Sequence, residues 1–286
     1  MSITTEDIKL LRESTGAGIL DCKKALTETD GDMDAAIEIL RKKGLAAAAK
    51  KASREANDGL IAAQMSDDGK TAVMVEVNCE TDFVARTEDF QNFVNTLLRQ
   101  MMAQPEIDSA EALLAAPFID DSSKTVQDQL TETIAKLGEN MRIRRAARFD
   151  LQDGGIIDSY IHLEGRVGVL VEVGGGDADD EKFAELVHDV ALQIAAIPPL
   201  YVSEDDVPAD AIAAEKDVFM AQLANENKPD NIKERIVEGK LKKWYSEVTL
   251  LNQEFVKDSD LTIAKLLKNY GDNVKVRRFA RFERGA

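Results

Sequence analysis

Cysteine and histidine are scarce in this sequence, which has only two of each among 286 residues. The two cysteines, Cys22 and Cys79, are far apart, and together with the two histidines they show no spacing typical of a metal site. Two thiols do not make a disulfide framework, so we expect both cysteines to be buried and free. The sequence therefore predicts no metal site and no bound cofactor.

Long apolar runs are also missing. No stretch approaches the roughly 20 residues that a membrane-spanning helix needs. The chain begins MSITTEDIKLLRE, with acidic residues where a secretory signal has a basic start and an apolar core. We therefore expect a cytoplasmic protein that does not bind membranes.

The sequence lacks the common motifs of nucleotide-binding and hydrolytic enzymes. It has no Gly-x-x-x-x-Gly-Lys-Ser/Thr loop, so the protein is not expected to hold GTP itself, and no Gly-x-Ser-x-Gly elbow. Three glycines at 174–176 follow a predicted strand without the dinucleotide-binding spacing. These absences favour a protein that is not an enzyme.

Positive charge is in short supply, with 36 basic residues against 53 acidic ones and a net charge of −17. Such a surface repels phosphate backbones, so we expect no direct binding of nucleic acid. The exceptions are two Arg-rich predicted strands, near residues 142–148 and 277–281. Strand alternation predicts Arg142, Arg144 and Arg148 on one face, where we expect them to pair with carboxylates rather than with RNA.

Residues 1–54 have the pattern of three short helices. Apolar positions at helical spacing include Ile8, Leu11, Ile19, Cys22 and Leu26. The break at 29–32 offers Asp30 or Asp32 as an N-cap for a third helix, and the Ala- and Lys-rich stretch at 42–54 predicts its extension. This segment is expected to be a helical domain.

From about residue 57 the apolar period changes to two. Residues 60–64 and 71–77, with a turn at 67–69 between them, predict a β-hairpin. An amphipathic helix around Phe90 to Leu98, a helix at about 126–138 and a strand at 141–149 follow. We assign residues 55–153 to one α+β subdomain.

The same design recurs further along the chain. Strand 73–77 matches 169–173 at a separation of 96 residues, and 138–145 matches 271–278 at a separation of 133. This repeat predicts a second, related α+β subdomain at 154–286 with about 37 extra residues. Two apolar helical faces, separated by a turn at 225–230, predict that the extra residues form an antiparallel, coiled-coil helical hairpin at about 208–245.

The two copies differ after their matched strands. The second copy continues with a plain loop at 174–177, whereas the first has Asn78 to Arg86, with Phe83 beside an acidic residue. One interpretation is that Thr81 or Asp82 caps the next helix while Phe83 packs into the local core. The other is that Phe83 projects as an apolar wedge into another protein.

Four segments, in the same order, resemble signature segments of the bacterial elongation factor Ts family, whose members are exchange factors for elongation factor Tu. They are 11–26, 77–84, 136–145 and 159–162. The likeness extends from residue 1 to about residue 283. It implies that residues 1–54 form a ubiquitin-associated-like domain that docks on the GTP-binding domain of elongation factor Tu.

The resemblance also implies a site. Asp82 and Phe83, flanked by Thr81 and Val84, would enter beside the magnesium and phosphate site of the GTPase and speed the release of GDP. Further contacts on the same partner would come from a smaller set of residues. These are Leu137, Gly138 and His162, with Lys23 a candidate in the helical domain.

A different function remains open at this point. The protein could be a scaffold or adaptor without exchange activity, and its helical arm could mediate a homodimer. The two functions differ in one observable, because an exchange factor must raise the rate at which its partner, elongation factor Tu, loses GDP, whereas a scaffold binds without changing it.

Overall fold

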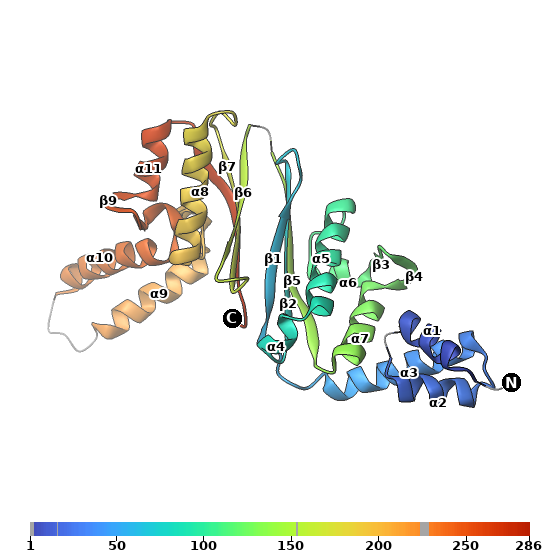
Figure 1. Cartoon of the computed structure of the whole chain (residues 1–286). Coiled ribbons are helices and arrows are strands. Elements are labelled where there is room, and N and C mark those ends of the chain that lie inside the picture. The colour runs from blue at the N-terminus through green and yellow to red at the C-terminus, as the bar shows by residue number, and fades with distance from the viewer. Residues whose placement is uncertain (1–2, 16, 153, 224–228) are drawn as a thin grey trace.

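The computed structural model describes residues 3–15, 17–152, 154–223 and 229–286, and it is a mixed α+β structure, as predicted (Figure 1). The helices are α1 Thr5–Thr15, α2 Ile19–Glu28, α3 Met33–Lys51, α4 Asp82–Ala85, α5 Glu88–Ala103, α6 Ala110–Ala115, α7 Val126–Leu137, α8 Glu181–Ala196, α9 Ala209–Gln222, α10 Asp230–Val248 and α11 Ile263–Tyr270. The strands are β1 Asp58–Met65, β2 Thr71–Cys79, β3 Pro117–Phe118, β4 Asp121–Thr125, β5 Met141–Asp150, β6 Gly155–His162, β7 Val167–Gly174, β8 Glu254–Phe255, β9 Asp258–Thr262 and β10 Lys275–Glu283. Among these described helices, none is long and apolar enough to cross a membrane.

The first three helices pack around a small apolar core of their own. Leu11, Cys22 and Leu26 are fully buried there, as their helical spacing predicted. Asp32 caps α3, since its Oδ1 accepts a hydrogen bond of 3.1 Å from the backbone N–H of Ala35. The Ala- and Lys-rich stretch continues α3 as far as Lys51, and this extension packs against α7.

Two three-stranded antiparallel sheets face each other in the middle of the molecule (Figure 1). Their strand orders are β1-β2-β5 and β10-β7-β6. Helices α5, α6 and α7 cover the outer face of the first sheet, and α8 and α11 cover that of the second. The layer between the sheets is apolar and consists of Ile61, Ala72, Met74, Phe149, Ile157, Leu170 and Phe282.

The two copies also share individual side-chain hydrogen bonds. Helices α5 and α8 each bury a glutamine completely, Gln100 and Gln193, at matching positions. The Gln100 side chain donates to the carbonyl oxygen of Pro117 and accepts from the N–H of Ile119. Gln193 makes the two equivalent bonds to the β8–β9 hairpin. Each glutamine thus secures a short hairpin that the alternation of the sequence did not predict.

The extra residues of the second copy form α9 and α10, which lie side by side (Figure 1). The matched helices α5 and α8 start 93 residues apart, and the matched hairpins at β3 and β8 start 137 apart. The insertion is therefore 44 residues. The sequence repeat indicated only 37 because the second copy lacks three residues before α8 and four around α11. Most of the turn predicted at 225–230 lies outside the described residues.

The prediction that Arg142, Arg144 and Arg148 share a face is wrong. Arg142 pairs with Asn78 and Arg148 with Val73, which lie on opposite faces of β2. The register shifts at Arg144, which is an extra residue in the strand, and such a bulge reverses the alternation beyond it.

The bulge turns Arg145 toward the layer between the sheets. There its guanidinium contacts the fully buried carboxylate of Glu76 at 2.6 Å. The second copy has the same bulge, and Arg278 contacts the fully buried carboxylate of Glu172 at 2.8 Å. Of the three arginines named from the sequence, Arg148 pairs with the exposed carboxylate of Asp150 at 2.8 Å and Arg142 donates to the carbonyl oxygen of Ala52. The buried carboxylates are paired instead with Arg145 and Arg278, which the alternation did not single out.

Candidate functional site

The residues that only the first copy has between its hairpin and its long helix form α4, a single helical turn. Thr81 is its N-cap, with Oγ1 accepting a 3.4 Å hydrogen bond from the N–H of Val84. Val84 and Ala85 face the apolar core between the first sheet and its helices. Phe83 therefore points outward, and its side chain is 81% exposed. The interpretation that Thr81 or Asp82 caps this helix is therefore correct. The interpretation that Phe83 packs into the local core is wrong.

A single exposed apolar side chain is common on protein surfaces. What distinguishes Phe83 is the fixed backbone that carries it. Asp82, immediately before it, is half-exposed and forms an ion pair of 3.2 Å with Arg86 at the other end of the turn. An aromatic ring held outward beside charged groups is typical of a protein-binding surface.

The predicted residues Leu137 and Gly138 lie next to this turn. Gly138 is exposed and ends α7 with a left-handed backbone, φ 83°, while Leu137 is half-buried against the core. Glu139 follows, and its carboxylate accepts hydrogen bonds from the backbone of Glu80 and Thr81. The structure thus brings together two predicted segments that lie more than 50 residues apart in the sequence.

His162 lies at the end of β6 and is exposed. Its Nδ1 is 2.8 Å from the hydroxyl of Tyr160. The turn after it rests on β1, where the N–H of Ile61 donates to the carbonyl oxygen of Gly165 at 2.9 Å. Since α4 also contacts β1, His162 and α4 lie at the same end of the paired sheets (Figure 1).

Lys23 lies apart from this group. It is exposed on α2, at the end of the molecule where the first three helices pack (Figure 1). Its neighbours Ile19 and Leu20 are 58% and 81% exposed. The spacing of the sequence assigned Ile19 to the buried face, which is wrong, and Leu20 was missed because it lies off that face. Together they form an apolar surface beside Lys23.

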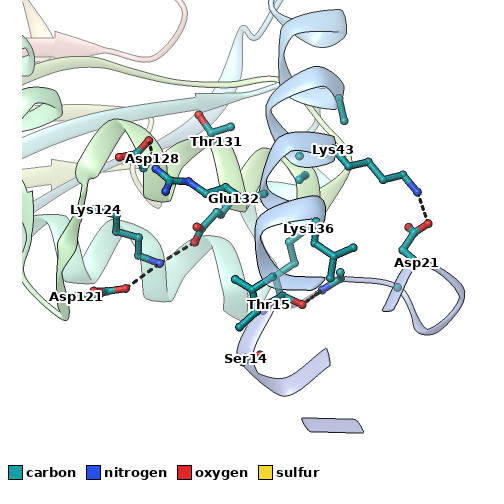
Figure 2. A pocket seen from close by; sticks show the side chains of 18 residues that line it. Ser14, Thr15, Asp21, Lys43, Asp121, Lys124, Asp128, Thr131, Glu132 and Lys136 are labelled. Carbon is teal, nitrogen blue, oxygen red and sulfur yellow. Dashed lines mark hydrogen bonds and ion pairs between the residues drawn. The ribbon is translucent and has the colours of Figure 1, made fainter. Parts of the chain in front are cut away.

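A cavity of about 400 Å³ lies between the first three helices and the α7 region (Figure 2). Its charged side chains are paired: Arg41 of α3 contacts Asp128 of α7 across it at 3.2 Å, and Lys124 contacts Glu132 within the α7 wall at 2.7 Å. A hydrogen bond from the backbone N–H of Thr125, supported by Arg41, holds the pKa of Asp128 below its usual range. The lining therefore presents balanced charge rather than a cluster selective for one kind of ion.

Metal ligands do not gather anywhere in the described ranges, since no three His, Cys, Asp or Glu side chains form a group able to hold an ion. Cys79, at the start of the α4 segment, is buried, and its Sγ lies 3.1 Å from the carbonyl oxygen of Thr81. Burial, together with the nearby carboxylates of Glu139 and Asp58, raises the pKa of the Cys79 thiol to about 12.

We expect Cys79 to resist alkylation in the native protein. With a pKa of about 12, roughly one thiol in ten thousand is a thiolate at pH 8, and the thiolate is the reactive form. Intact mass after treatment with iodoacetamide at pH 8 should show no adduct at Cys79, whereas treatment in urea should modify both cysteines. Rapid native modification that maps to Cys79 would contradict the buried position.

Comparison with known proteins identifies the family. The family described as Elongation factor TS matches residues 80–286. Elongation factor Ts of Clostridium novyi (strain NT) is 49% identical over 287 residues, covering 99% of this chain and 93% of the relative. Elongation factor Ts of Clostridium kluyveri (strain NBRC 12016) is 50% identical, and that of Clostridium perfringens (strain 13 / Type A) is 48% identical, over the same shares. The chain therefore belongs to the elongation factor Ts family and is a translation elongation factor.

Proposed function

We propose that this protein is a guanine-nucleotide exchange factor that binds elongation factor Tu and promotes the release of GDP. The observation that carries the proposal is the 81% exposed ring of Phe83 on a capped helical turn. The second copy of the same scaffold has no such turn. A feature added to one copy alone is explained by a task outside the fold.

In the proposed mechanism, Asp82 and Phe83 enter beside the magnesium and phosphate site of the GTPase, with Thr81 and Val84 holding the turn that carries them. Leu137, Gly138 and His162 bind the same partner domain. The N-terminal domain, residues 1–54, is ubiquitin-associated-like and docks through the surface around Lys23. Two α+β subdomains, 55–153 and 154–286, complete the cytoplasmic protein, which is not an enzyme and carries no cofactor.

Energetics favour several contacts over one. This protein and GDP must each weaken the affinity of elongation factor Tu for the other, and the ratio is the same in both directions. Burial of one phenylalanine contributes about 1.5–3 kcal/mol, which corresponds to roughly one or two powers of ten in affinity. A larger weakening of GDP binding therefore requires the helical domain and the surface around Leu137 and His162 as well.

The decisive experiment is stopped-flow release of a fluorescent GDP from elongation factor Tu. We expect the release rate to rise with the concentration of this protein and to saturate. Binding without acceleration would instead support a scaffold or adaptor. In that case the arm, with Val218, Met220 and Ile232 exposed, would be tested for homodimer formation by sedimentation.

A further inference from the structure

We propose that Glu139 is a positioning residue that holds the Asp82–Phe83 turn in its binding geometry; this inference rests on the proposed function. The Glu139 carboxylate accepts three hydrogen bonds from the residues just before α4. They come from the backbone N–H of Glu80 at 3.1 Å, the backbone N–H of Thr81 at 3.0 Å and the Thr81 hydroxyl at 2.7 Å.

The hydrogen bonds to Glu139 stabilise α4, which is too short to be stable by itself. A helix of four residues has no stability of its own, because the cost of nucleation exceeds what one turn returns. Its first N–H groups need acceptors outside the helix. By donating to Glu139, the Thr81 hydroxyl turns its lone pairs toward the N–H of Val84, which it caps. One carboxylate thus fixes both the approach to the turn and the orientation of its cap.

The attachment is reciprocal. The Glu80 carboxylate accepts a 2.6 Å hydrogen bond from the backbone N–H of Asn140, next to Glu139, and lies 3.4 Å from Arg54. The Asn140 side chain in turn donates to the carbonyl oxygen of Arg54 at 2.7 Å. The turn is therefore clamped to the end of α7 and to the segment that follows α3, so that Gly138 and Phe83 keep a fixed relative position.

The second copy provides an internal comparison. Asp272 stands where the first copy has Glu139, and it is exposed, with its carboxylate accepting no hydrogen bond in the described part of the chain. Instead the backbones meet directly, because a Cβ at Gly175 would lie 2.0 Å from the carbonyl oxygen of Asn273. The clamp is thus present only in the copy that carries Phe83.

Glu139→Gln keeps the size of the side chain but replaces one acceptor oxygen with an NH₂ group facing N–H donors. Without the clamp, the partner must order the turn during binding. We expect the concentration of this protein needed for half-maximal acceleration of GDP release to rise about tenfold, a size typical of losing charge-assisted hydrogen bonds. The saturating rate should change less, because Phe83 is still present. Asp272→Asn, the matched change in the second copy, should leave both values as in the wild type.

Two measurements test the inference. In the free protein, hydrogen–deuterium exchange of the 80–86 segment should accelerate in Glu139→Gln, while the circular dichroism melt falls by no more than about 2–4 °C. This holds whether or not the protein is an exchange factor. In stopped flow, Glu139→Gln added to Asp82→Ala/Phe83→Ala should be no worse than Asp82→Ala/Phe83→Ala alone. Unchanged hydrogen exchange, or fully additive kinetic losses, would overturn the positioning role. A wild-type protein that fails to accelerate GDP release would overturn the proposed function instead.

Discussion

The combined substitution Asp82→Ala/Phe83→Ala/His162→Ala is expected to bring GDP release close to the rate of elongation factor Tu alone. Phe83→Ala by itself should lower the acceleration by roughly 10–100-fold, the equivalent of the apolar burial of one ring. The other two changes remove polar contacts at the same end of the sheets. The losses should therefore be graded for single variants and nearly complete for the triple one, as measured by stopped flow at subsaturating factor.

All three side chains are at least partly exposed, so the triple variant should fold normally. Val256→Ala is the matched control, because Val256 is a 46% exposed apolar residue at the β8–β9 hairpin, away from α4. It should exchange GDP as fast as the wild type. If the triple variant stays folded and keeps most of its activity, the α4 surface is not where exchange is driven.

The repeat made most of the fold predictable. Two matched hairpins and two matched last strands specify two related sheets, because the same alternation of apolar residues gives the same pairing. The missing pieces are those that alternation does not encode. The bulges at Arg144 and Arg277 add one residue each, and the apolar alternation of the sequence does not indicate them. The short hairpins depend on the buried side chains of Gln100 and Gln193, which bond to backbone groups 17 and 61 residues further along the chain.

The sequence named residues for the candidate site but not their geometry. The pattern around Phe83 fits both a packed and a projecting ring, and the choice is made by Val84 and Ala85, which take the inward positions. The sequence did not indicate a role for Glu139, because a glutamate after a helix on an acidic chain is usually solvated. Its partners lie 58 and 59 residues earlier, and no local spacing connects them. Such side-chain bonds to a distant backbone become visible only in the folded chain.

Arg145→Met is expected to lower the free energy of unfolding by about 3–5 kcal/mol, because it leaves the buried Glu76 carboxylate without its cation. Glu76 is 0% exposed, and its remaining donors are the side chain of Asn78 at 3.0 Å and the backbone N–H of Gly285 at 3.3 Å. The substitution also removes the guanidinium that lies 4.7 Å from the ring centroid of Phe282 in the other sheet.

Urea denaturation followed by circular dichroism measures this loss. Arg144→Met is the matched control, since the bulged Arg144 is exposed, and surface changes usually stay within about 0.5 kcal/mol. Changing Glu76 to Gln together with Arg145→Met should recover much of the stability, because no buried charge is then left unpaired. A loss below about 1 kcal/mol for Arg145→Met would contradict this argument. In the second copy Glu172 contacts two guanidinium groups, Arg278 at 2.8 Å and Arg277 at 2.9 Å, so the loss of Arg278 alone should cost less. The guanidinium of Arg278 lies 4.2 Å from the ring centroid of Phe149. The two sheets are thus joined by a pair of reciprocal contacts, each sheet's arginine reaching an aromatic ring of the other.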